Sequence, residues 1–202
     1  MCGIAGVFAP SGAPGGEHLR GAIAAMTATL RHRGPDGEGV WLDEASRMAL
    51  GHRRLSVLDL SPAGAQPMIS ASGRLVISYN GEVHNHRELR AELESKGHRF
   101  RGHSDTEVIL EACSEWGVEA TIRRLIGMFA IALWDRRDRT LTLIRDRMGI
   151  KPLYWGWIGT VFAFGSELKA LRAVPGWNAE VDRDALAAYM RHGYVPAPKS
   201  IY

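Results

Sequence analysis

The spacing of apolar residues along the chain predicts a domain that mixes helices with antiparallel strands. Between Glu17 and Arg33 apolar residues recur at helical spacing, and one face of that helix holds Leu19, Ile23, Met26 and Leu30. Gly34 and Pro35 are typical of a helix end. The preceding stretch, residues 9–16, is dense in glycine and proline and predicts a loop.

Short apolar runs at 38–42, 47–59 and 74–80 are typical of β-strands. Two further runs predict hairpins. Residues 128–146 place a charged turn between two apolar strands, and residues 152–166 repeat the arrangement with glycine in the turn.

Two more helices are predicted, at 84–97 and at 104–117. The second opens with Ser104 followed by Glu107, which is a capping box, and Gly117 ends it. Cys113 falls on its apolar face, where a buried structural thiol is expected. Because strands come in runs with helices grouped between them, the pattern predicts an α+β layered domain.

Composition narrows the classes of function. The 202 residues carry 25 basic and 22 acidic side chains, a net charge of +3, with the basic residues scattered. We therefore interpret clusters such as residues 31–33 as solvated and expect no nucleic-acid partner. No apolar run is long enough to span a bilayer, so no membrane association is expected. Two cysteines form no disulfide framework, and a cytoplasmic location is expected.

Cys2 is the first residue whose chemistry suggests catalysis. Removal of Met1 would give one residue both a thiol and a free α-amine. An α-amine has a reference pKa of roughly 7.7–8.0, so a useful fraction is neutral near pH 7 and can accept the thiol proton. The alternative is an inert, buried small thiol.

A thiolate that attacks an amide needs donors for the developing oxyanion. Asn80 offers a side-chain N–H, and Gly81 offers a backbone N–H with no Cβ in the way. Glu82 adds a carboxylate to the same stretch. The alternative interpretation is an Asn-Gly β-turn.

Two charged residues suggest recognition of an amino acid. Arg54 and its neighbour Arg53 lie in an apolar strand run, so one of them is expected to point inward. An inward arginine suits a substrate carboxylate, or else an internal salt bridge. Asp105 lies in the first turn of a capped helix, where the helix dipole favours its ionised form. A carboxylate there could bind a substrate ammonium. The alternative is an acidic residue that only stabilises the helix end.

Together these residues predict a pocket for an amino-acid amide. Arg54 would hold an α-carboxylate, while Asp105 and Glu82 would hold an α-ammonium. Cys2 would attack the amide, and Asn80 with Gly81 would stabilise the oxyanion. Glutamine has this pattern of groups.

The chain resembles the N-terminal glutaminase domain of glutamine-hydrolysing asparagine synthetases, which are class II glutamine amidotransferases of the N-terminal-nucleophile hydrolase superfamily. The resemblance runs in order over essentially the whole chain, through "MCGIAGVF", "RHRGPDG", "HRRLSVLDLSPAGAQPM", "YNGEVHNHRELR", "GHSDTEV", "GMFAIALWD", "RDRMGIKPLY" and "GSELKAL".

The resemblance implies a four-layer αββα sandwich of two antiparallel sheets, loss of Met1, a glutamyl-thioester at Cys2 and release of ammonia. The glutamine-binding positions that it implies are Arg54, Leu55, Ser56, Val57, Leu58, Asn80, Gly81, Glu82 and Asp105. One residue departs from the family pattern, because His84 stands where tyrosine is usual. The nearby His86 suggests metal binding, but with no third ligand placed no metal is expected.

The resemblance further implies that residues 1–190 form the amidotransferase domain and that residues 191–202 begin a linker to a C-terminal synthetase domain. That domain would use ATP and magnesium to amidate aspartate. Residues 1–202 contain no G-x-x-x-x-G-K-[ST] phosphate loop, and no cofactor is expected for the amidotransferase domain. Other acceptors, namely a sugar, a peptide or an antibiotic precursor, stay open, as does a homodimer. An amidase for another amide and an inactive regulatory module are the competing functions.

Overall fold

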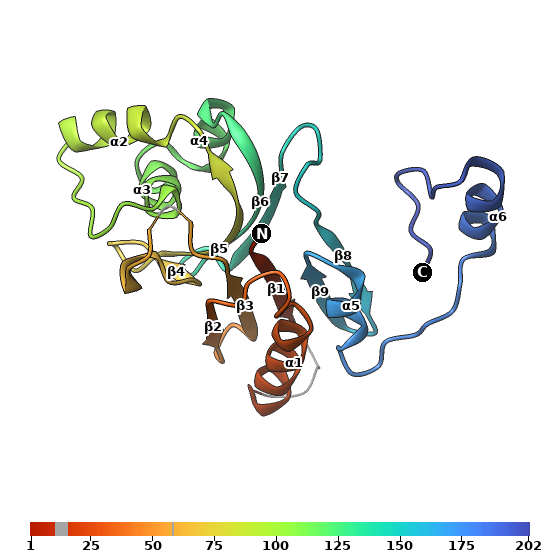
Figure 1. Ribbon diagram of the computed structural model, residues 1–202. Helices are drawn as coiled ribbons and strands as arrows, with labels where there is room; N and C mark the ends of the chain where they lie inside the picture. The colour runs from red at the N-terminus through yellow and green to blue at the C-terminus, as the bar shows by residue number, and fades with distance from the viewer. Residues whose placement is uncertain (11–15, 58) are drawn as a thin grey trace.

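The computed structural model describes residues 1–10, 16–57 and 59–202, which form two antiparallel sheets packed face to face (Figure 1). The first sheet has the strand order β2-β3-β1-β9-β8 and the second has the order β4-β5-β6-β7. The strands of the first sheet are β1 (Gly3–Phe8), β2 (Gly37–Asp43), β3 (Met48–Arg54), β8 (Tyr154–Ile158) and β9 (Val161–Gly165). Those of the second are β4 (Met68–Ile69), β5 (Leu75–Val83), β6 (Gly127–Asp135) and β7 (Thr140–Arg145).

Helices cover the outer face of each sheet. On the first sheet lie α1 (Gly16–Thr29) and α5 (Leu168–Arg172), and on the second lie α2 (His86–Ser95), α3 (Asp105–Trp116) and α4 (Val118–Arg124). A short 3-10 turn, η1 (Pro62–Gly64), stands between β3 and β4. The predicted four-layer αββα sandwich is therefore confirmed, and Figure 1 shows its N-terminus where the two sheets meet.

Three apolar clusters hold the layers together. One packs between the sheets around Trp134 and Phe164, one lies beneath α1 and α5, and one lies beneath α2, α3 and α4. Along β5 the side chains of Val76, Ser78 and Asn80 share the face toward the other sheet, because successive strand residues point to opposite faces. The alternation therefore brings Asn80 to the level at which the sheets meet.

Several element predictions are confirmed, including both hairpins and the helix that ends at Gly117, whose φ of 81° suits glycine. The capping box is half formed: Ser104 accepts the Glu107 N–H, but the Glu107 carboxylate accepts the N–H groups of Arg101 and Gly102 instead. The predicted strand 47–59 was too long, because the chain leaves the sheet after Arg54.

Other predictions differ from the structure. The first helix ends at Thr29, not at Arg33, since residues 30–33 fold into a turn with Leu30 N–H on Thr27 O and Arg33 N–H on Leu30 O. Most of the loop predicted at 9–16 lies outside the described residues. The sequence pattern missed β1, α4 and α5, all short or rich in glycine and alanine.

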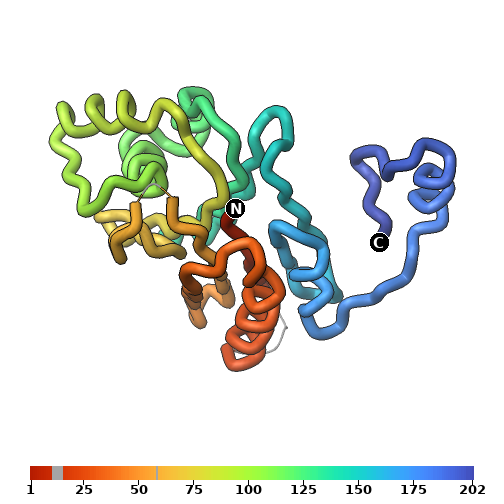
Figure 2. Tube along the Cα trace, in the orientation of Figure 1, coloured from red at the N-terminus to blue at the C-terminus, as the bar shows by residue number. Residues whose placement is uncertain are grey.

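The C-terminal segment stands apart from the sandwich. Figures 1 and 2 show the chain leaving the first sheet in an extended stretch before α6 (Arg183–His192), which sequence analysis also missed. The segment folds back on itself, with Asp182 N–H donating to Ile201 O and the rings of Trp177 and Tyr202 packed edge to face. The domain boundary at residue 190 stays a prediction.

Candidate active site

A cavity of about 270 Å³ opens where the two sheets meet, and most of the predicted site residues line it. From the first sheet and the loop after β3 come Cys2, Arg54, Leu55 and Val57; from the second sheet and α3 come Asn80, Gly81, Glu82 and Asp105. Ser56 does not line the cavity, and its N–H donates to Asp36 Oδ2 at 2.9 Å. Leu58 lies outside the described residues.

Cys2 immediately precedes β1, so its position is fixed by the central strand of the first sheet. Its Sγ accepts the N–H of Leu55 at 3.3 Å and lies 3.6 Å from the Leu55 carbonyl oxygen. The carbonyl of Cys2 accepts Arg33 Nε–H at 2.9 Å. Both the backbone and the thiol of this residue are therefore held in place.

Burial raises the pKa of the Cys2 thiol above its ordinary value, although the Leu55 N–H and the positive charges of the N-terminus and Arg54 oppose the shift. The thiol is thus mainly protonated near neutral pH. Nucleophilic attack from this position requires a base close to Cys2.

Arg33 is a residue that sequence analysis misjudged as solvated. Its side chain is only 8% exposed, and Nη1 forms an ion pair with Glu167 at 2.9 Å. Burial opposes ionisation of Glu167, but hydrogen bonds from Arg33, Lys169 and His32 lower the pKa of its carboxyl to about 2. An ionised Glu167 therefore aligns Arg33 on the Cys2 carbonyl. Only the motif "RHRGPDG" signalled this residue in the sequence.

Asn80 is buried, and its Nδ2 has no hydrogen-bond partner among the residues that the structure describes. A buried donor left unpaired costs about 1–3 kcal/mol, so such groups are rare and call for an explanation. Asn80 and Gly81 lie inside β5, so the alternative of an Asn-Gly turn is wrong.

The N–H of Gly81 points toward the same cavity. Tyr79 N–H donates to Gln66 Oε1 and Val83 N–H donates to Asp105 Oδ2, both on the edge of β5 away from β6. Because alternate residues of a strand present their N–H groups to the same edge, Gly81 N–H also faces that edge. β4 pairs only with Val76 and Ile77, so it leaves this part of the edge uncovered.

Glycine is required at position 81 by close packing. A Cβ there would collide with the carbonyl oxygen of Met128 and with the ring of Tyr79. The small residue lets β5 and β6 stay paired through Gly81 and Phe129 while the cavity is lined by bare backbone.

Arg54 and Arg53 point to different surroundings, as strand alternation predicts. Arg53 forms an ion pair with Glu38 at 2.8 Å and donates to the carbonyl of Thr27. The Arg54 guanidinium instead lines the cavity and donates to the carbonyl oxygens of Asp59 and Ser61. A guanidinium has five N–H donors, so donors remain for a carboxylate.

Asp105 is 5% exposed, and its Oδ2 accepts the Tyr79 hydroxyl at 2.6 Å and the Val83 N–H at 3.0 Å. Burial nevertheless raises the pKa of the Asp105 carboxyl, with these two hydrogen bonds acting against the shift. The expectation that the helix dipole governs its charge is therefore incomplete, because desolvation acts in the opposite direction.

Cavity residues that sequence analysis missed include Asp59, Gln66, Met128 and Lys151. Lys151 Nζ lies 3.3 Å from the sulfur of Met1, which stands at the cavity mouth. No spacing pattern marks these residues, because they come from loops and from a strand end brought together only by folding.

Elsewhere, Cys113 is buried beneath α3 as predicted, and burial raises the pKa of its thiol to about 11. His86, at the start of α2, donates its Nδ1–H to the Val83 carbonyl oxygen at 2.8 Å. Within the described ranges, no three His, Cys, Asp or Glu side chains are grouped to hold a metal ion. None of the helices formed by those residues is long and apolar enough to cross a membrane.

The sandwich of two antiparallel sheets between helices, with Cys2 just before a central strand and with Asn80 and Gly81 lining the same cavity, is the fold of the N-terminal-nucleophile hydrolase class. Within that class the chain belongs to the glutamine amidotransferase domain family, whose model matches residues 1–202.

Curated relatives support the same family. The chain is 39% identical to asparagine synthetase [glutamine-hydrolyzing] 1 of Bacillus subtilis, over all of this chain and 31% of that protein. It is 43% identical to asparagine synthetase [glutamine-hydrolyzing] 3 of the same bacterium, over 80% of this chain and 26% of that protein. The chain thus spans about a third or less of these relatives' length.

Solved structures share the fold. A glutamine phosphoribosylpyrophosphate amidotransferase from B. subtilis, complexed with ADP and GMP, superposes with a TM-score of 0.67 and 21% identity, over 85% of this chain and 43% of that one. A second structure, described as the allosteric regulatory enzyme of purine biosynthesis, gives a TM-score of 0.68 and 22% identity over the same shares.

Proposed function

We propose that this domain hydrolyses L-glutamine to glutamate and ammonia through a thioester on Cys2. The observation that carries the proposal is that Asn80 Nδ2 has no hydrogen-bond partner in the described part of the chain and is buried beside a cavity that Cys2, Arg54 and Asp105 also line. An unpaired donor at that place suits an oxyanion that exists only during reaction.

In the first half-reaction the Cys2 α-amine, freed by loss of Met1, takes the thiol proton. The sulfur then attacks the side-chain amide carbon of glutamine, and Asn80 and Gly81 donate to the resulting oxyanion. When the C–N bond breaks, the protonated α-amine gives its proton to the leaving nitrogen, which departs as ammonia.

In the second half-reaction the neutral α-amine takes a proton from water, and the resulting hydroxide attacks the thioester carbon. The C–S bond breaks, glutamate leaves, and the proton returns to the sulfur. Arg54 holds the substrate α-carboxylate throughout, and Asp105 with Glu82 holds the α-ammonium.

We further propose that the ammonia acceptor binds to another domain of a longer protein. The names of the relatives and the small share of their length matched here support a fused synthetase domain that forms asparagine. The use of ATP and magnesium by that domain stays an expectation from the resemblance. A sugar, peptide or antibiotic precursor remains the alternative acceptor, and a coupled assay of the longer protein with each acceptor distinguishes them.

Measurement of ammonia release from glutamine by the purified chain tests the hydrolysis, with Cys2→Ala and Cys113→Ala as a matched pair. We expect Cys2→Ala to abolish hydrolysis and to leave the fold intact, because it removes one sulfur atom that lines the cavity and keeps the backbone contacts of residue 2. Cys113→Ala should keep full activity, since that thiol lies beneath α3. Activity retained by Cys2→Ala would overturn the mechanism, and an inert wild-type chain would favour a regulatory module.

A further inference from the structure

Asp59 joins the loop that follows Arg54 to the loop that precedes Asp105, and these two residues bring opposite charges to the cavity. The residue follows the end of β3, is 8% exposed, and was not among the predicted site residues. Its Oδ1 accepts the N–H and the hydroxyl of Ser61 at 2.8 and 2.6 Å, and its Oδ2 accepts the N–H of His103 at 2.9 Å. Although Asp59 also lines the cavity, both of its carboxylate oxygens are thus engaged.

The first of these loops follows Arg54, the last residue of β3, and binds its guanidinium. Asp59 and Ser61 present their carbonyl oxygens to the Arg54 guanidinium, and the Asp59 carboxylate closes the turn from which those carbonyls project. Gly64 packs against this unit, where a Cβ would collide with Arg54 Nη2. The turn therefore fixes the position of the Arg54 guanidinium.

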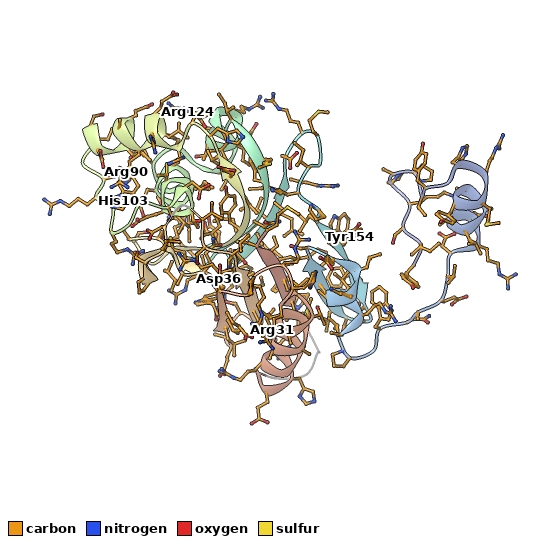
Figure 3. The ribbon with its side chains drawn as sticks, viewed as in Figure 1. Arg31, Asp36, Arg90, His103, Arg124 and Tyr154 are labelled. Carbon is orange, nitrogen blue, oxygen red and sulfur yellow. The ribbon has the colours of Figure 1, made fainter. Side chains whose placement is uncertain are left out.

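The second loop leads into Asp105, the first residue of α3. His103 lies two residues before Asp105, on the segment that leads into α3, where Figure 3 labels it. A Cβ on Gly102 would lie 2.6 Å from Asp59 Oδ2, so the carboxylate packs directly against this backbone. Asp59 therefore connects the first sheet's loop to the helix that covers the second sheet.

Asp59 is charged when it makes these contacts. Hydrogen bonds from the Ser61 hydroxyl and the His103 N–H, with the positive charge of Arg54, lower the pKa of its carboxyl to about 2 although burial opposes the shift. Hydrogen bonds to an ionised acceptor are roughly twice as strong as neutral ones, so the link between the loops is firm.

We propose that Asp59 is a positioning residue that sets the separation of Arg54 and Asp105, and thereby selects substrates with a zwitterionic amino-acid head. The proposal rests on the proposed function, in which those two residues bind the α-carboxylate and the α-ammonium. It assigns Asp59 no contact with the reacting atoms.

Asp59→Asn breaks one link whichever way the amide is turned. If the amide oxygen faces Ser61, its NH₂ group meets the His103 N–H, and two donors then oppose each other. The reverse orientation sets the NH₂ group against the Ser61 N–H. Loss of charge-assisted hydrogen bonds predicts a KM for glutamine raised about 10- to 100-fold, with kcat changed less than about threefold.

The test compares two reagents that alkylate Cys2 in the chain with a free N-terminus. Iodoacetamide has no amino-acid head, whereas 6-diazo-5-oxo-L-norleucine carries the head of glutamine. Asp59→Asn should lower the rate of Cys2 alkylation by the diazo reagent at least about tenfold. The rate with iodoacetamide should stay within about twofold of that of the wild type. Asp135→Asn is the matched control, because Asp135 also accepts two backbone N–H groups in a turn, from Arg137 and Asp138, outside the cavity.

Equal slowing of both reagents, or no slowing of either, would overturn the positioning role. If Asp59→Asn does not fold, as judged by circular dichroism, Ser61→Ala takes its place and should slow only the diazo reagent, by about two- to fivefold. An unchanged ratio in Ser61→Ala also overturns the proposal. The wild-type arm reports separately on the proposed function: without glutamine hydrolysis and rapid diazo labelling, that function fails and this inference with it.

Discussion

Two groups of cavity residues, called the two ends of the cavity below, differ in how their polar side chains are hydrogen-bonded. At the proposed chemistry end, formed by Cys2, Asn80 and Gly81, Asn80 Nδ2 has no partner among the described residues, and among them the thiol contacts only the backbone of Leu55. At the proposed recognition end, formed by Arg54 and Asp105, both charged groups already form hydrogen bonds within the protein.

The difference reflects what each end does in the proposed reaction. A charge that forms only in the transition state is best stabilised by donors that are fixed in place and have no other hydrogen-bond partner. Such a buried, unpaired donor lowers the stability of the fold. A charge present in the ground-state substrate is met by side chains held at the correct separation beforehand. Substitutions at the two ends should therefore affect kcat and KM differently.

The largest difference is expected from Asn80→Ala, which removes the idle donor. We expect kcat for glutamine hydrolysis to fall about 10²- to 10³-fold with little change in KM, because the contact strengthens only in the transition state. Steady-state kinetics measures both values.

Asn85→Ala is the matched control for that variant, because both ends of the Asn85 amide are bonded, to Arg124 O and to Ile126 N–H. It should lower stability and leave kcat unchanged. A rise in KM alone for Asn80→Ala would remove Asn80 from the oxyanion site.

Arg54→Ala tests the recognition end. Loss of the carboxylate's partner should lower kcat/KM about 30- to 1000-fold, mainly through KM. Arg53→Ala serves as the control, since Arg53 pairs with Glu38 away from the cavity. If both arginine variants bind glutamine equally well, carboxylate recognition lies elsewhere.

The smallest effect on activity is expected from His52, which joins the strands behind the two ends. His52 Nε2–H donates to Tyr79 O, and Arg54 and Asn80 follow closely on β3 and β5. Burial lowers the pKa of His52 to about 4, because desolvation disfavours the charged imidazole, while the Tyr79 carbonyl opposes the shift.

Between pH 6.5 and pH 4 the unfolded state therefore binds more protons at His52 than the folded state does. The contribution of His52 to the free energy of unfolding is complete above pH 6.5, and about 2 kcal/mol of it should be lost between pH 7 and pH 5. Urea unfolding at the two pH values measures this loss, and His52→Gln should reduce it while exposed His84→Gln should not. An equal loss in both variants would assign the pH dependence to other groups.

Sequence alone predicted much of the molecule. Periodicity located the hairpins at 128–146 and 152–166 and the helix that ends at Gly117, because an apolar stripe and a cap are local features. Strand alternation correctly gave Arg53 and Arg54 different surroundings, but the expectation that one of them points to solvent was wrong, because the Arg53 side chain is only 12% exposed and pairs with Glu38. The roles assigned to Cys2, Asn80 and Gly81 are consistent with their positions and stay predictions until tested.

Long-range contacts were beyond the sequence pattern. Arg33 was judged solvated because its partners, Glu167 and the Cys2 carbonyl, come from distant parts of the chain. Burial of Asp105 could not be foreseen from a helix cap alone. Asp59 connects segments 44 residues apart, and only folding brings His103 to its carboxylate.

The central claim is that the Cys2 α-amine is the base, and one measurement tests it directly. Ammonia release is compared between protein that begins at Cys2 and protein that keeps Met1, with each N-terminus verified by intact mass. A retained Met1 turns the amine into an amide that accepts no proton, and it also stands at the cavity mouth beside Lys151. We predict a rate at least about 10²-fold lower for the Met1 form. Equal rates in the two forms would contradict the account.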